Sequence, residues 1–111
     1  MEIITSRQNR LALSLAALND KKNRDAEGLF LLDGRKLFLE AAASGLIFKH
    51  VVCTERYYLD HKNEVEKYSP IIFSEGVFDK ISRENSPDGI ICVLDYLDNL
   101  HKKTTIYNYF K

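Results

Sequence analysis

The sequence predicts an α/β fold: a three-layer α/β/α sandwich built on a small, mainly parallel mixed sheet. Two observations carry this prediction. Short apolar runs alternate along the chain with segments whose apolar residues recur at helical spacing, which is the order of a sheet with covering helices. The runs at 29–32 and 90–94 are also apolar at nearly every position, which is typical of strands buried on both faces.

The chain has 111 residues and the composition of a folded globular domain, with 45% hydrophobic and 29% charged residues. Residues 1–97 are predicted to form one domain. Residues 98–111 show no clear period and are predicted to be a linker or the truncated start of a following domain. Because the apolar runs are too short for a bilayer and the N-terminus lacks a signal-peptide pattern, we expect a cytoplasmic protein with no membrane partner.

Charge is distributed unevenly along the chain, although the formal net charge is zero. The net charge is +2 over residues 1–36, −5 over residues 37–98 and +3 over residues 99–111. A basic end on an acidic body predicts that a polyanion approaches the molecule from one side.

A helical pattern follows the first apolar pair of the chain. Thr5 or Ser6 is the predicted N-cap, and leucines spaced from Leu11 to Leu18 form the core-facing stripe. Continuation of the helix to about residue 24 is left open by Asn and Asp at positions 19–20, which favour caps and turns. If the helix continues, cations line one edge of it: Arg7, Arg10, Lys21 and Arg24, with Lys22 beside them. This row is either an RNA-facing surface or an ordinary solvated face.

The stretch 27–45 is predicted to be a buried strand that turns directly into an amphipathic helix. At the corner, Gly34 lets backbone amides approach a ligand, and the new helix begins there with the positive end of its dipole. Arg35 and Lys36 add two full charges, so the corner suits a phosphate. The alternative is a plain strand-to-helix turn in which Asp33 is the N-cap.

Further elements are predicted after this corner helix, which Gly45 closes. They are a strand at 47–54, a peripheral helix that begins near Asp60 or His61, a short strand at 70–73, a helix capped by Ser74-Glu75, and a strand at 90–94 after a turn at 85–89. The strand at 47–54 is expected to complete a βαβ unit with the strand at 29–32.

Residue sets for catalysis or metal binding are missing from the sequence. His50, His61 and His101 are scattered without ligand spacing. Cys53 and Cys92 lie in strand-like runs without Cys-x-x-Cys spacing, so they are predicted to be buried thiols in a reducing compartment. No glycine-rich nucleotide motif or nucleophile elbow occurs. We therefore expect no metal site and no catalytic residue in this chain.

Several motifs, taken in order, resemble one family of RNA-modifying enzymes. They are Ile4-Thr5-Ser6-Arg7-Gln8-Asn9, the stretch from Lys21 to Leu37, and the later Ile81-Ser82 and Ser86-Pro87-Asp88-Gly89-Ile90. Over roughly residues 3–96, the chain resembles the N-terminal substrate-binding domain of SpoU-type (TrmH-like) RNA ribose 2′-O-methyltransferases, members of the SPOUT superfamily. The chain departs from this pattern at Asp33, where that family usually has glutamate.

The resemblance implies a fold like that of the small ribosomal kink-turn-binding proteins, in a domain that grips RNA and presents it to a separate, knotted methyltransferase domain. S-adenosylmethionine is expected only in that catalytic domain, which normally follows the segment ending near Leu97, so this chain should hold no cofactor. The implied partners are rRNA or tRNA and the protein's own C-terminal methyltransferase domain. A homodimer of the parent protein is a further expectation.

The expected function is therefore RNA recognition for rRNA or tRNA ribose methylation. The residues expected to contact RNA are Arg7, Arg10, Lys21, Lys22, Arg24, Gly34, Arg35 and Lys36. The alternative function is a protein-interaction module that docks on its catalytic domain or on a partner subunit. The acidic middle segment favours that alternative.

Overall fold

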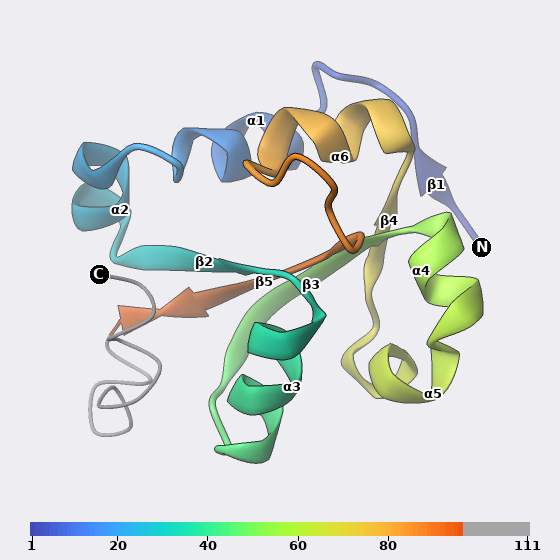
Figure 1. The fold of residues 1–111 in the computed structure, drawn as a ribbon. Coiled ribbons are helices and arrows are strands. Elements are labelled where there is room, and N and C mark those ends of the chain that lie inside the picture. Colours follow the sequence, from blue (N-terminus) through green and yellow to red (C-terminus); the bar gives the residue numbers. More distant parts are fainter. Residues whose placement is uncertain (97–111) are drawn as a thin grey trace.

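A computed structural model describes residues 1–96, and Figure 1 shows the course of the chain. The expected boundary at Leu97 and the segment 98–111 lie outside the described residues. The strands are β1 (Ile3–Ile4), β2 (Leu29–Asp33), β3 (Phe48–Thr54), β4 (Ile71–Phe73) and β5 (Ile90–Asp95). The helices are α1 (Arg10–Ala17), α2 (Lys21–Glu27), α3 (Arg35–Ala43), α4 (Glu55–Asp60), α5 (Lys62–Val65), the short 3₁₀ helix η1 (Glu66–Tyr68) and α6 (Glu75–Ile81).

The strands form a five-stranded mixed sheet in the order β1-β4-β3-β5-β2. The neighbours β1 and β4 are parallel, as are β4 and β3, whereas β5 runs antiparallel to both β3 and β2. Among the strands within residues 1–96, four therefore point the same way and β5 runs opposite to them. The predicted α/β class with a mainly parallel mixed sheet is confirmed.

The predicted βαβ unit is present, but its two strands are not neighbours. β5 lies between β2 and β3, with Leu31 and His50 both facing Val93 in the two registers. The unit is therefore split by a strand that comes some 40 positions later in the sequence, which no local pattern around residues 29–54 could indicate.

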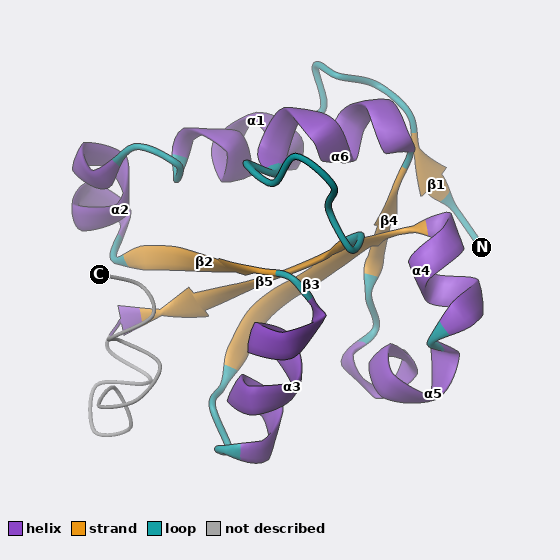
Figure 2. Cartoon of the chain, viewed as in Figure 1, coloured by secondary structure: helices purple, strands orange, loops and turns teal. Residues whose placement is uncertain are grey.

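Helices lie on both faces of the sheet, with α1 and α6 on one face and α3, α4 and α5 on the other (Figure 2). Buried apolar side chains form one cluster under each set of helices. In β5, Ile90, Cys92 and Leu94 belong to the α3 side, while Ile91 and Val93 belong to the α1 side. Because β5 serves two cores, its sequence is apolar at every one of these positions.

The first helix begins later than predicted. Asn9 is the N-cap of α1, and its Oδ1 accepts the N–H of Ala12 at 3.0 Å. The predicted caps, Thr5 and Ser6, are wrong. Ser6 instead accepts the N–H of Gln8 through its hydroxyl oxygen at 3.1 Å, which stabilises the turn that leads into the helix.

The continuation of the first helix to about residue 24, which the sequence left open, does not occur. Asp20 caps a separate helix, α2, by accepting the N–H of Lys22 at 3.0 Å. Figure 1 shows a turn between α1 and α2, so the cations of the two segments do not share one helix edge. The competing tendency of Asn19-Asp20 toward caps decides this local structure.

The helix after β3 begins earlier than the predicted start at Asp60 or His61. Thr54 ends β3 and caps α4, because its Oγ1 accepts the N–H of Tyr57 at 3.1 Å. By contrast, the cap at Ser74 and the closure of α3 at Gly45 are confirmed: Ser74 Oγ accepts the N–H of Val77 at 3.4 Å. The N–H of Gly45 donates to a carbonyl of α3 at 3.1 Å.

Cys53 and Cys92 are free and fully buried, as predicted. Burial raises the pKa of the Cys53 thiol to about 12 and raises the pKa of Cys92 as well, so both remain protonated at neutral pH. Within residues 1–96, no helix has the length and apolar character needed to cross a membrane.

Candidate nucleic-acid interface

The four strands that point the same way end along one side of the sheet, which we call the carboxyl edge. Its residues are those that follow β1, β2, β3 and β4, at 5–7, 34–36, 55–57 and 74–76, together with the turn 87–89 that precedes β5. In open α/β sheets, ligands bind in the crevice outside the carboxyl ends of the strands. The carboxyl edge is therefore the first place to search for a site.

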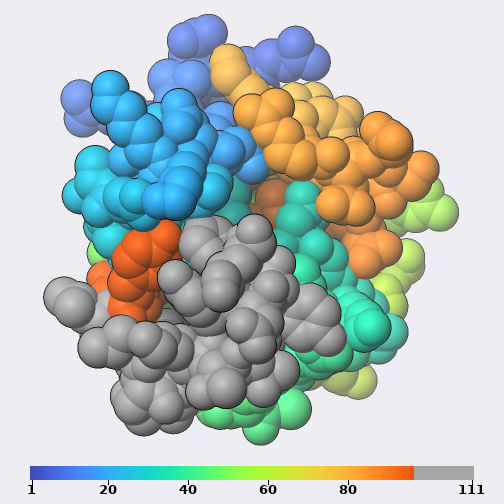
Figure 3. Space-filling view, turned by 60° about the vertical axis from the view of Figure 1, so that its left-hand side comes forward, coloured from blue at the N-terminus to red at the C-terminus, as the bar shows by residue number. Residues whose placement is uncertain are grey.

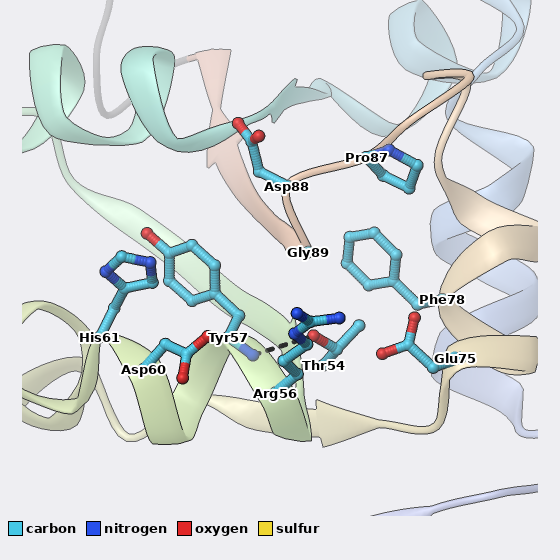
Figure 4. A pocket seen from close by; sticks show the side chains of 10 residues that line it. All are labelled: Thr54, Arg56, Tyr57, Asp60, His61, Glu75, Phe78, Pro87, Asp88 and Gly89. Carbon is cyan, nitrogen blue, oxygen red and sulfur yellow. Dashed lines mark hydrogen bonds between the residues drawn. The ribbon is translucent and has the colours of Figure 1, made fainter.

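A pocket of about 200 Å³ opens at this edge between α4, α6 and the turn before β5 (Figure 4). We call it the carboxyl-edge pocket, and its lining residues are Thr54, Arg56, Tyr57, Asp60, His61, Glu75, Phe78, Pro87, Asp88 and Gly89. These residues come from three segments that are far apart in the sequence. Polar and aromatic side chains therefore meet here only because of the sheet topology.

The inner wall of the pocket is built by a close contact between Thr54 and Gly89. A Cβ at Gly89 would lie 2.7 Å from Thr54 Oγ1, and the backbone of Gly89 has φ +101°. The N–H of Thr54 donates to the carbonyl of Gly89 at 3.0 Å. Thr54 is 4% exposed and is the buried polar residue among residues 1–96. Only glycine permits this approach of the two chain segments.

The corner between β2 and α3, predicted to bind phosphate, already holds a carboxylate. Asp88 Oδ2 accepts the backbone N–H of Arg35 at 2.9 Å, at the N-terminus of α3. A Cβ on Gly34, the N-cap of this helix, would lie 3.4 Å from the same oxygen. Asp88 thus occupies the place that the prediction gave to a phosphate oxygen, and it satisfies the dipole of α3.

The side chain of Arg35 also has a protein partner. Its guanidinium forms a two-pronged ion pair with Glu64, in which Nε donates to Oε1 at 3.1 Å and Nη2 donates to Oε2. Tyr57 donates its hydroxyl to Glu64 at 3.1 Å, and His61 Nδ1 lies 3.8 Å from the same carboxylate. The hydrogen bond from Arg35 holds the pKa of Glu64 below its usual value. Arg35 therefore joins α3 to α5.

Asp33 does not cap α3, contrary to the plain-turn interpretation of the corner. Its Oδ2 accepts the hydroxyl of Ser82 at 2.8 Å and lies 3.4 Å from the donating N–H of Arg83. Burial raises the pKa of Asp33, and this effect exceeds that of the two hydrogen bonds, which lower the pKa by stabilising the charged carboxylate. The shorter aspartate side chain thus fastens the end of α6 to the end of β2.

Arg7 lies beside the pocket. A Cβ on Gly76, in the first turn of α6, would lie 3.2 Å from Arg7 Nη2, so the guanidinium covers the residue next to Glu75. Arg10, the first residue of α1, lies at the same end of the helix pair because α1 and α6 run in the same direction. Their C-terminal ends are joined by Asn19 Nδ2, which donates to the carbonyl of Ile81 at 2.7 Å.

The cations of α2 lie away from the carboxyl edge, at the opposite end of β2 (Figure 1). Figure 3 shows α2 above the end of β5, where the N–H of Tyr96 donates to the carbonyl of Gly28 at 2.8 Å. Lys21 pairs with Asp25 at 2.7 Å on the surface, and Arg24 donates to the carbonyl of Leu18 at 3.0 Å. Arg24 therefore satisfies a backbone carbonyl at the C-terminal end of α1.

The structure thus divides the eight residues predicted to contact RNA into two groups. Arg7, Arg10, Gly34, Arg35 and Lys36 lie at the carboxyl edge, and Lys21, Lys22 and Arg24 lie at α2. Among residues 1–96, the exposed side chains of Arg7, Arg10, Lys22 and Lys36 form no salt bridge.

Sequence reasoning missed Arg56, Tyr57 and Glu75 as site residues. Their signal was available, since Arg56 and Tyr57 lie in the first helical turn after the capping Thr54, and Glu75 directly follows the capping Ser74. A group of three or more His, Cys, Asp or Glu residues able to hold a metal ion is absent from residues 1–96.

A family model described as "MRM3-like substrate binding domain" matches residues 9–92, which is most of the chain. The chain belongs to this family. The match spans both the carboxyl-edge pocket and α2, and it begins two residues after Arg7. No curated protein matches the chain significantly.

Solved methyltransferase structures share the fold of this MRM3-like domain. An RNA 2′-O ribose methyltransferase is similar with 26% identity and a TM-score of 0.68, covering 83% of this chain and 36% of its own. The rRNA methyltransferase of Sinorhizobium meliloti is 23% identical with a TM-score of 0.64, covering 85% of this chain and 36% of its own. The SpoU methyltransferase AviRb of Streptomyces viridochromogenes, solved with AdoMet, is 16% identical with a TM-score of 0.63, covering 78% and 35%.

The MRM3-like chain therefore spans about one third of the length of these solved methyltransferases. The predicted membership in the substrate-binding domains of SpoU and TrmH type is confirmed. The likeness to kink-turn-binding proteins stays a prediction.

Proposed function

We propose that this chain binds structured RNA at its carboxyl edge and presents it to a methyltransferase domain. The observation that carries this proposal is the geometry of the edge: a small polar and aromatic pocket lies between Arg7 and the start of α3. Arg7, Arg10 and Lys36 supply exposed charge around it, and phosphate contacts of this kind hold and orient nucleic acids. Membership in a family of substrate-binding domains supports the same function.

The acidic residues of the edge shape this interaction. Asp60, Glu75 and Asp88 line the pocket itself, so a phosphate is disfavoured inside it and favoured around it. Arg35 forms an ion pair with Glu64, and Arg24 donates to a backbone carbonyl, so the main role of both side chains is to stabilise the fold. In the proposal, Lys21 and Lys22 form a second, weaker contact region at α2. S-adenosylmethionine would bind in the methyltransferase domain, and the complex would form in the cytoplasm.

Salt dependence tests the proposal. If about four cations contact phosphates, the logarithm of affinity falls with the logarithm of salt concentration at a slope of roughly −3 to −4, using the coefficient for duplex DNA. Filter binding of this chain to a hairpin from ribosomal RNA, at several potassium chloride concentrations, measures the slope. Affinity no higher than that of a neutral control protein, at low salt, would overturn the proposal.

Two charge-reversal pairs locate the contact. Arg7→Glu with Arg10→Glu is expected to weaken binding at least about tenfold at low salt and to make the slope shallower by roughly two. Lys21→Glu with Lys22→Glu makes the same change in net charge at the other end of β2 and should weaken binding less. A larger effect of the α2 pair would place the main RNA contact at α2 instead.

The protein-interaction module is the second candidate, supported only by the acidic middle segment. Under that function, neither charge-reversal pair changes RNA affinity, while binding to a purified methyltransferase domain continues.

A further inference from the structure

The carboxyl-edge pocket combines charged side chains of both signs with two buried aromatic rings in a small volume. Pockets that enclose drug-sized ligands hold roughly 300–1,000 Å³. The volume here is about 200 Å³, which is enough for one planar heterocycle. RNA offers such groups wherever a base is unpaired and turned out of the helix.

The walls of the pocket are fixed before any ligand binds. Figure 4 shows the Tyr57 and Phe78 rings on opposite sides, with Gly89 between them. Tyr57 is 3% exposed and Phe78 is 0% exposed, so packing holds both rings in place and leaves neither ring an open face for stacking; contacts with a ligand therefore come from the rim. The hydroxyl of Tyr57 is also held by Glu64. A rigid site of this kind loses little conformational freedom when a flat ring enters.

Two charged groups on the rim stay available for a ligand. Arg56 comes from the first turn of α4 and Glu75 from the first turn of α6, and both line the pocket. Within residues 1–96 neither forms a salt bridge. A guanidinium offers a fork of donors, and a carboxylate offers two acceptor oxygens, so the pair complements a ring that has acceptors on one edge and donors on the other.

We propose that the carboxyl-edge pocket receives one unpaired guanine base of the RNA, held by Glu75 and Arg56. Guanine carries two adjacent donors, N1–H and N2–H, that match the carboxylate, and the acceptors O6 and N7 that match the guanidinium. Cytosine, adenine and uracil each offer a carboxylate fewer adjacent donors. This inference rests on the proposed function, because the base is delivered by a bound RNA.

Titration with free nucleotides tests the pocket apart from RNA binding. Guanosine 5′-monophosphate is added to ¹⁵N-labelled protein, and the amide signals of Thr54, Gly89 and Glu75 are followed by NMR. These signals are expected to shift with GMP at concentrations at least about fivefold lower than with AMP, CMP or UMP, the smallest discrimination that a bidentate base contact provides. Equal responses to all four nucleotides would overturn the guanine assignment.

Variants at the rim identify the groups that read the base. Glu75→Gln and Arg56→Ala are each expected to remove the preference for GMP. Glu55→Gln is the matched control for Glu75, because Glu55 is also an exposed acidic residue in a first helical turn and does not line the pocket. Arg83→Ala is the control for Arg56, being an exposed arginine outside the pocket. Both controls should keep the preference, and a loss in either would contradict the proposal.

A set of four RNA hairpins, differing only in one bulged nucleotide, separates this proposal from the proposed function. Tighter binding of the guanine hairpin by at least about fivefold, lost in Glu75→Gln, supports both. Equal affinity for all four hairpins, with no GMP-dependent shifts at Thr54 and Gly89, overturns the guanine pocket and leaves RNA binding in place. GMP-dependent shifts without affinity for any hairpin overturn the proposed function and leave a guanine site.

Discussion

At the scale of single residues, the interface depends on a few side chains that join distant segments. Asp88 fixes the start of α3, Asp33 fixes the end of α6, and Glu64 holds Arg35. Each of these carboxylates accepts hydrogen bonds from another part of the chain. These acidic residues, none of which was predicted to join distant segments, therefore build the site. Two of the arginines predicted to contact RNA, Arg24 and Arg35, bond to other groups of the protein.

Gly89 is the residue whose replacement should reveal how tightly the pocket wall is packed. Gly89→Ala places a Cβ against Thr54 and forces an L-residue to φ +101°, so we expect a loss of about 2–4 kcal/mol in the free energy of unfolding, from strain and overpacking together. Urea denaturation measures this loss.

Gly28→Ala is the matched control, because Gly28 also has positive φ, at +68°, but has nothing within 4 Å of the added Cβ. It should cost about 1–2 kcal/mol, the ordinary penalty of the left-handed region. Equal losses in the two variants would show that the contact with Thr54 does not contribute.

At the scale of elements, local patterns predicted the strands well because each apolar run is short, continuous and bounded by turn residues. The predicted strands at 47–54, 70–73 and 90–94 differ from the observed β3, β4 and β5 by one residue at an end. Helix starts were predicted less well. Asn9 caps α1 where Thr5 or Ser6 was predicted, and Thr54 caps α4 well before the predicted helix start near Asp60 or His61. The insertion of β5 between β2 and β3 is determined by contacts that are distant in sequence, because side chains of β5 pack into both cores.

The candidate site was predictable only in part for the same reason. The corner at 33–36 lies within one local stretch, and its position at the carboxyl edge follows from the strand before it. The pocket requires Arg56, Glu75 and Asp88 to meet, and these residues come from separate elements whose strand order was not known. Partners such as Glu64 for Arg35, 29 positions apart, have no signal in sequence spacing.

Two carboxylates that join elements should give opposite dependences of stability on pH. The pKa of Glu64 is lowered in the folded state, so its stabilising effect is present above its unfolded pKa and is lost as pH falls through the folded value. The pKa of Asp33 is raised by burial, so its contribution is full below the unfolded pKa and is lost as pH rises through the folded value.

Urea unfolding of Glu64→Gln and Asp33→Asn between about pH 3.5 and 7 tests these signs, with the unperturbed carboxyl range near pH 4 as reference. Relative to the unsubstituted protein, the destabilisation by Glu64→Gln should grow as pH rises. The destabilisation by Asp33→Asn should shrink or reverse over the same range. Parallel curves for the two variants would contradict the assigned environments.

At the scale of the whole molecule, the sheet separates two cores that share β5. Leu94 belongs to the core under α3, whereas Leu15 and Phe78 belong to the core under α1 and α6. The pocket lies where elements from both sides meet, with Tyr57 from one core and Phe78 from the other in its walls. Its shape therefore depends on the cooperation of the two layers.

Amide hydrogen exchange measured on the Leu94→Ala variant should show whether the two layers unfold together. Removing this fully buried side chain is expected to cost about 2–5 kcal/mol, a large part of the stability of a domain of this size. Because β5 is hydrogen-bonded to both β2 and β3, the loss should lower amide protection in α1 and α6 as well as in α3. Leu13→Ala, at a position 39% exposed on α1, is the control and should leave protection in all three helices nearly unchanged. Protection lost in α3 alone would instead mean that the two layers open independently, in which case the pocket walls would not be held as one unit.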